Sequence, residues 1–270
     1  MRTLAGRWGL PVPILLLLIM TCAGALAFTL LGLSGVRQLV ARGVASDHNE
    51  APSAIFQAGG TIYAVFLAFL VVTVWESHEA AHANVSEEAS LLSTLYRGAS
   101  AMEPQSAGGL RIQIRAYTRA VIDDEWPLQS QGRGASEVAR SASLGMFRVF
   151  GALSPSARQN DSAIDNVQLG LIAQVQADRN KRTLASEESI SPVIWMAAVA
   201  NGVFVVVMSF FLYADRDWPH IVMSGILATM IAMLLSVIFI LDHPFSGLLS
   251  LPPDAFQHSL GVYDSVDRTP

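Results

Sequence analysis

Four long apolar stretches, each free of charged residues, constrain this sequence more than any other feature. A helix rises 1.5 Å per residue, so about 20 apolar residues cross the hydrocarbon core of a bilayer. Inside lipid the polar backbone groups must be satisfied within the segment, so these stretches are predicted to be helices. The predicted spans are residues 14–33, 54–75, 193–213 and 221–241.

The first stretch also has an alternative interpretation. Arg2 and Arg7 precede it and Ala25-Leu26-Ala27 lies near its end, as in a secretory signal and its cleavage site. The apolar run continues past that point to Leu33, which is long for a signal peptide. We therefore predict an uncleaved membrane helix.

Composition agrees with a membrane protein. Charged residues make up 14% of the chain and hydrophobic residues 52%, whereas soluble domains carry about 25% charged residues. No basic patch with interleaved aromatic residues is present, so nucleic acid is not expected among its partners. Cys22 is the single cysteine, which excludes an intrachain disulfide.

The spans divide the chain into four parts. Residues 1–75 hold the first transmembrane pair, 76–189 an insert, 190–241 the second pair, and 242–270 a C-terminal tail. Four crossings place both termini and the insert on one side of the membrane. A small excess of Lys and Arg near the membrane on that side predicts that it is the cytoplasm.

The insert is predicted to be helical, which makes the whole fold all-α. Hydrophobic residues recur at helical spacing after the second span (Val85, Leu92, Leu95 and Met102), so that span is expected to continue as one long helix. Pro104 and Gly108-Gly109 are predicted to break it. Further helices are expected over residues 110–126, 136–153 and from 154 onward, the last with a buried face formed by Ile164, Val167, Leu171 and Val175.

The motif His78-Glu79-Ala80-Ala81-His82 matches H-E-x-x-H, which on a helix can bind zinc through its two histidines. A membrane zinc metallopeptidase is therefore one alternative. A catalytic zinc needs a third protein ligand, and no downstream motif supplies one. The simpler interpretation is a solvated or subunit-facing helix surface, so we predict no enzyme and no cofactor.

A second cluster, Asp123-Asp124-Glu125, has carboxylates that could hold a hard cation, although such a run is more often a solvated face. There is no phosphate-binding loop of the Walker type and no G-x-S-x-G turn in the sequence. The sequence therefore contains no motif that supports nucleotide hydrolysis or serine hydrolase chemistry.

Several short motifs occur in a characteristic order. They are His48-Asn49-Glu50, the end of the second span at Trp75-Glu76, Glu87-Glu88-Ala89, Leu95-Tyr96-Arg97, Glu125-Trp126-Pro127, and Asp242-His243-Pro244-Phe245. In this order they resemble the bestrophin-like domain family of bacterial and plant membrane proteins. The similarity covers residues 46–256.

The resemblance implies a homo-oligomer, pentameric like the bestrophins, that conducts small anions such as chloride. It also implies a bacterial inner membrane location and a pore lined by the second span. Pro244-Phe245 looks like part of the bestrophin calcium clasp, but Ser246 intervenes before the glycine and the dense acidic run is missing, so calcium gating is not expected.

On the second span, Ile62, Phe66 and Phe69 share a face at helical spacing, with Thr73 one turn further on. These four residues are the predicted pore-lining candidates, and the apolar ones could form a constriction that gates by dewetting. The alternative is that this face packs against neighbouring helices or lipid. At the level of function, the alternative to a channel is a non-conducting membrane scaffold or stress sensor.

Overall fold

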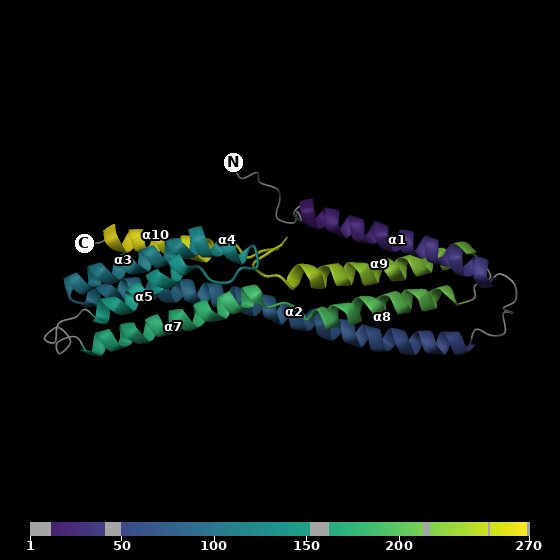
Figure 1. Cartoon of the computed structure of the whole chain (residues 1–270), viewed down its shortest axis with the longest axis horizontal. Helices are drawn as coiled ribbons and strands as arrows, with labels where there is room; N and C mark the ends of the chain where they lie inside the picture. The colour runs from purple at the N-terminus through teal and green to yellow at the C-terminus, as the bar shows by residue number, and fades with distance from the viewer. Residues whose placement is uncertain (1–11, 41–49, 152–161, 213–216, 248, 269–270) are drawn as a thin grey trace. The chain divides into compact units, whose positions relative to one another are not determined.

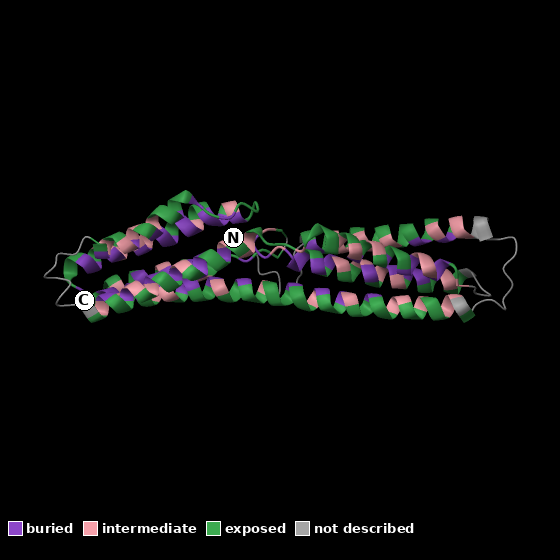
Figure 2. Ribbon diagram, turned by 60° about the horizontal axis from the view of Figure 1, so that its bottom comes forward, coloured by how far each residue is buried: buried purple, intermediate pink, exposed green. Residues whose placement is uncertain are grey.

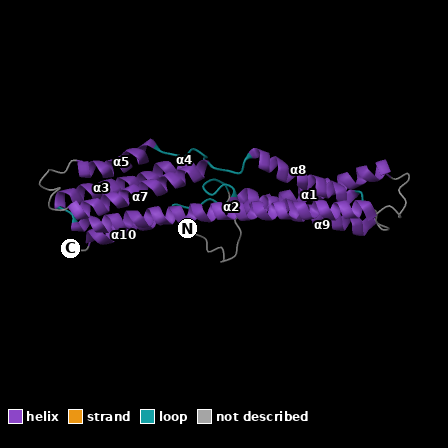
Figure 3. Cartoon of the chain, turned by 90° about the horizontal axis from the view of Figure 1, so that it is seen from below, coloured by secondary structure: helices purple, strands orange, loops and turns teal. Residues whose placement is uncertain are grey.

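The computed structural model describes residues 12–40, 50–151, 162–212, 217–247 and 249–268, and every regular element among them is helical (Figure 1, Figure 3). The all-α prediction is therefore confirmed. The chain separates into two compact units. We call Met1–Trp75 with Ile190–Asp242 the spanning unit, and Glu76–Ser189 with His243–Pro270 the insert unit.

The spanning unit contains four helices that are long and apolar enough to cross a membrane, as predicted. They are α1 (Val12–Val40), the first part of α2 (Glu50–Gly98), α8 (Pro192–Phe210) and α9 (Asp217–Leu241). The predicted end of the third span, Tyr213, lies outside the described residues. Helix α1 runs without interruption through Ala25-Leu26-Ala27 and packs along α9.

The four helices of the spanning unit share one apolar core. Tyr63 of α2 is buried there and its hydroxyl donates a hydrogen bond to the carbonyl of Ala198 on α8, at 3.1 Å. A Cβ on Gly202 would lie 2.6 Å from the same hydroxyl, so only glycine lets α2 and α8 approach this closely. The remaining buried apolar residues of this core include Leu33, Leu67, Leu70, Val74, Val205, Val206, Phe210, Ala228, Ile231, Ile238 and Leu241.

Helix α2 belongs to both units. It is a single helix from Glu50 to Gly98, and its buried residues after the span include Val85, Leu92 and Leu95. The prediction that the second span continues as one long helix is therefore confirmed. A 3₁₀ turn (Ala99–Ala101) follows it directly.

The insert unit is a helical bundle built on the distal part of α2. Its other elements are α3 (Pro104–Ala120), a π-helical turn η3 (Val121–Glu125), α4 (Trp126–Gln129), α5 (Glu137–Gly151), α7 (Ser162–Glu187) and α10 (Asp254–Arg268). Helix α10 contributes Phe256 and Tyr263 to the core of this unit.

Three details differ from the predictions. Gly108-Gly109 does not interrupt a helix but lies inside α3, whose first turn contains Pro104. The helix predicted to end at residue 126 is followed directly by α4, whose first turn contains Pro127, where proline needs no backbone donor. On α7, Val167 is 64% exposed and Leu171 half-buried, and polar residues including Gln168 and Arg182 are buried instead.

Candidate functional site

The four pore-lining candidates lie on the spanning part of α2, and three of them are on a side that the described residues leave uncovered. Ile62 is 72% exposed and Phe69 70% exposed, although both are large apolar side chains. Thr73 is also exposed, and its hydroxyl donates to the carbonyl of Phe69 at 2.9 Å. Phe66 differs, since it is half-buried and packs against the core of the spanning unit.

Small side chains accompany the large ones on this exposed side of α2; Figure 2 colours the exposed positions of the ribbon green. Ala58, Ala64 and Ala68 are all exposed, and no charged residue occurs in α2 between Glu50 and Glu76. Exposed alanines on a membrane helix allow another helix to approach closely. The surface can therefore accept a neighbouring helix on one flank while presenting Ile62 and Phe69 beside it.

The family-motif residues at the ends of this span are exposed. Glu50 lies in the first turn of α2, and Trp75 and Glu76 lie where the helix passes from the spanning unit to the insert unit. His48 and Asn49 lie outside the described residues.

A buried group of charged side chains forms the polar centre of the insert unit. Arg182 of α7 is fully buried and its Nε donates to Oε2 of Glu88 on α2 at 2.7 Å, while its Nη2 donates to Oε1 of Glu125 at 2.9 Å. Arg179 donates from Nη2 to the other oxygen of Glu125 at 2.6 Å. The Tyr117 hydroxyl donates to Glu88 at 2.5 Å. Two guanidinium groups therefore neutralise two carboxylates in the interior.

Backbone geometry explains how Glu125 reaches this centre. Glu125 is the last residue of the π-helical turn Val121–Glu125, in which the amide of Trp126 donates to the carbonyl of Val121. The extra residue in such a turn changes which side chains face inward. Asp123 and Asp124 are exposed while Glu125 is buried, so the three consecutive carboxylates do not converge.

The surroundings of Glu125 affect its charge state. Burial raises the pKa of Glu125, but the hydrogen bond from Arg179 and the charge of Arg182 outweigh burial, so that the pKa is lowered from its usual value. The backbone amide of Ser136, at the start of α5, also donates to this carboxylate at 2.9 Å. Burial together with the neighbouring Glu88 holds the pKa of Tyr117 well above its usual value. Glu125 is therefore an anion and Tyr117 a neutral donor.

Trp126 joins the last family motif to this centre. Its ring meets Phe245 edge-on, with 5.7 Å between ring centroids, and its Nε1 donates to the carbonyl of Leu251 at 3.0 Å. The carbonyl of Pro244 accepts from the amide of Leu251 at 2.8 Å, which closes the loop that carries Phe245. The structure thus brings Glu125-Trp126-Pro127 and Pro244-Phe245 together.

Asp242, in contrast, acts within the spanning unit. Its carboxylate accepts hydrogen bonds from the backbone amide of Ile190 at 2.8 Å and from Nε1 of Trp195 at 3.1 Å. These bonds fasten the start of α8 to the end of α9. Asp242 is adjacent in sequence to the Pro244-Phe245 motif, but its contacts lie in the spanning unit, whereas those of Phe245 lie in the insert unit.

The zinc motif lacks a third ligand among the described residues. His78 is half-buried and His82 exposed on α2, and no group of three potential metal-ligating side chains occurs in the part of the chain that the structure describes. Two histidines alone do not make a catalytic zinc site. The described geometry gives no support to a peptidase.

Comparisons with known proteins give a consistent result. The profile of the bestrophin-like domain family matches residues 23–256. Two variants of a bacterial bestrophin homologue from Klebsiella pneumoniae have similar structures. One has a TM-score of 0.70 at 12% identity over 92% of this chain and 97% of its own. The other has a TM-score of 0.72 at 13% identity over 94% of this chain and 96% of its own. A variant described only as a membrane protein has a TM-score of 0.73 at 14% identity over 93% of this chain and 99% of its own. No curated protein matches the sequence.

Proposed function

Because the chain belongs to the bestrophin-like domain family, we propose that its copies assemble into a ring in the membrane and form an anion channel lined by the spanning part of α2. Four helices are too few to enclose a wide pore within one chain, and a cyclic assembly solves this by giving one helix of each copy to the axis. The preference for anions such as chloride and the pentameric count rest on resemblance to the bestrophins.

The uncovered side of α2 carries this proposal. Ile62 and Phe69 would project toward the axis from each copy and form rings of apolar side chains. Such rings gate by dewetting and impose no fixed charge on the permeating ion. The exposed alanines Ala58, Ala64 and Ala68 would let the α2 helices of neighbouring copies approach one another.

The orientation is part of the same proposal. In this proposal the insert unit and both termini lie in the cytoplasm of a bacterium, and the channel lies in the inner membrane. The bias of Lys and Arg between the two sides of the membrane supports this. Two of the arginines that contribute to it, Arg179 and Arg182, are buried in the insert unit.

Planar-bilayer recording of the purified full chain tests the proposal. Phe69→Ala should increase the single-channel conductance, because it removes a large side chain from the proposed constriction. Phe204→Ala on α8 is the matched control, since Phe204 is an equally large and 63% exposed side chain on a different span. Phe66→Ala separates pore lining from packing, because its half-buried ring should matter mainly for stability.

Two outcomes of the recordings would contradict the proposal. One is the absence of conductance from wild type and Phe69→Ala alike, with the protein shown to be folded and reconstituted. The other is a conductance that neither Phe69→Ala nor Phe204→Ala changes, which would contradict the lining of the pore by Phe69. The first outcome favours the scaffold alternative.

A further inference from the structure

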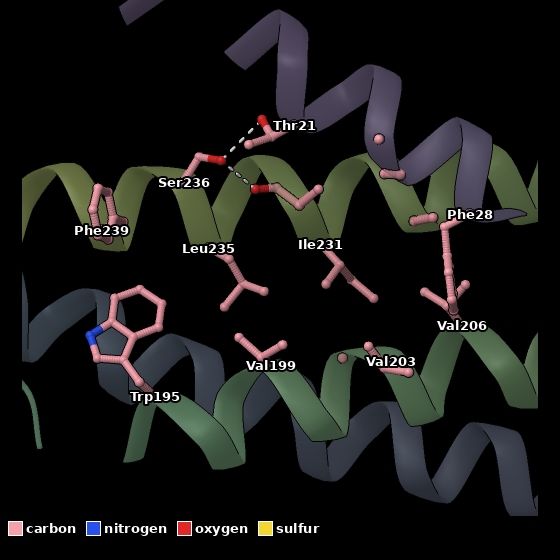
Figure 4. A pocket seen from close by; sticks show the side chains of 15 residues that line it. Thr21, Phe28, Trp195, Val199, Val203, Val206, Ile231, Leu235, Ser236 and Phe239 are labelled. Carbon is pink, nitrogen blue, oxygen red and sulfur yellow. Dashed lines mark hydrogen bonds between the residues drawn. The ribbon is translucent and has the colours of Figure 1, made fainter. Parts of the chain in front are cut away.

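The spanning unit contains an apolar groove between α1, α8 and α9 that is separate from the proposed pore surface of α2. Its volume is about 450 Å³, within the range of sites that hold small molecules. Figure 4 shows Trp195 and Phe239 at one end and Phe28 and Val206 at the other. The groove is not enclosed, and its walls include Thr21, Gly24, Val199, Val203, Ile231, Leu235 and Ser236.

The two hydroxyl groups in the groove already have partners. Ser236 donates to the carbonyl of Ala232 at 2.7 Å and lies 3.2 Å from the hydroxyl of Thr21. The Thr21 hydroxyl in turn reaches the carbonyls of Leu17 and Leu18, each at 3.0 Å. Neither side chain needs a polar ligand, so the chemistry of the lining selects an apolar occupant.

The length of the groove matches one leaflet of a bilayer. From Trp195 to Val206 along α8, the rise of 1.5 Å per residue gives about 16 Å, and half of the hydrocarbon core is about 15 Å. Trp195 marks the polar end of the groove, because its Nε1 donates to the carboxylate of Asp242, the charged residue that directly follows α9. Tryptophan with one polar partner is typical of the interface between hydrocarbon and headgroups.

We propose that this groove binds one acyl chain of a phospholipid, with the headgroup at the Trp195–Asp242 end and the chain running toward Phe28. Every helix that lines the groove is long and apolar enough to span the membrane, so lipid hydrocarbon is the medium expected at its opening. A concave apolar wall makes more dispersion contacts with a chain than the convex surface of a single helix does. The bound chain is therefore part of the packing between α1 and α8.

Gly24 provides a way to fill the groove without disturbing the protein. A Cβ at Gly24 would meet nothing within 4 Å, so Gly24→Phe places a ring in open space along the groove. Gly35 lies on the same helix, also has open space at its Cβ, and is not part of the groove. Gly35→Phe is therefore the matched control. Val203→Trp fills the groove from α8 and serves if Gly24→Phe fails to fold.

The test uses the full chain reconstituted in phosphatidylcholine vesicles that contain a phosphatidylcholine with a photoactivatable diazirine on one acyl chain. After illumination, adducts are mapped by peptide mass spectrometry. We expect adducts concentrated on groove residues of α8 and α9, reduced in Gly24→Phe and Val203→Trp to the level of other lipid-facing residues, and unchanged in Gly35→Phe.

Two results would overturn the proposal. Adducts spread evenly over all exposed apolar residues, and insensitive to Gly24→Phe, would show that lipid contacts the groove without binding in it. Absence of adducts from the groove, together with crosslinks there between copies of the chain, would show that a second copy covers it. Neither result bears on conduction, which the recordings test separately.

Discussion

Replacement of Arg182 with methionine should strongly destabilise the insert unit. The side chain of Arg182 is fully buried and pairs with both Glu88 and Glu125. Methionine keeps much of the volume but leaves Glu88 without its guanidinium partner and Glu125 with Arg179 alone. Removing one partner of a buried ion pair costs about 3–5 kcal/mol. Because each 1.4 kcal/mol is tenfold, opening of the unit should become about a hundred- to a few-thousand-fold more frequent.

Hydrogen exchange of the full chain in detergent measures this effect. Amides of α7 and α3 that exchange by opening of the insert unit should exchange faster by that factor, because exchange reports the free energy of opening. Arg140→Met is the matched control, since Arg140 pairs with Glu137 on an exposed helix surface. Exposed pairs of this kind contribute about 0.3–0.5 kcal/mol. If Arg182→Met accelerated exchange no more than Arg140→Met, the charged centre would have no role in stability.

Three further predictions concern the same unit. The pKa of Glu125 is lowered from its usual value of 4.5 in the folded protein. Its carboxylate therefore stabilises the unit fully above about pH 4.5, and this contribution is lost as the pH falls through the folded pKa. The melting temperature should accordingly decrease only below about pH 4.5. Gly247→Ala should cost about 1–3 kcal/mol in chemical unfolding, because the backbone there has φ +96°, whereas Gly261→Ala within α10 should stabilise by about 0.5–1 kcal/mol. Trp126→Phe should cost about 1–3 kcal/mol and speed exchange near Leu251, whose carbonyl loses its donor; unchanged exchange there would contradict it.

The spans and the family were predictable from sequence because lipid imposes a simple requirement. A stretch of about 20 apolar residues without charge has few alternatives to a membrane helix. The structure places such helices at all four predicted positions, and the ordered motifs predicted the family that the profile match confirms. The pore-lining role of Ile62, Phe66, Phe69 and Thr73 remains a prediction, because one chain does not show what faces the axis of an assembly.

Helix boundaries in the insert were less predictable, because local breakers compete with packing. Gly108-Gly109 stays helical inside α3, where neighbouring residues such as Leu110 and Ile114 are fully buried. Helix α10 was not predicted, although Phe256 and Tyr263, seven residues apart, both lie in the core. An intrinsic cost of about 1 kcal/mol for a helical glycine is small beside the burial of such side chains.

The buried charges were not predictable from apolar stripes alone, because charged residues occupy positions within those stripes. On α7 the apolar residues Ile172 and Val175 continue at helical spacing into Arg179 and Arg182. On α2, Glu88 interrupts the buried stripe between Val85 and Leu92 in the same way. A charged residue in line with buried apolar ones must find an opposite charge in the interior. Cations on one stripe and an anion on another therefore predict that the two helices pack together, and the pairing of Arg182 with Glu88 is that contact.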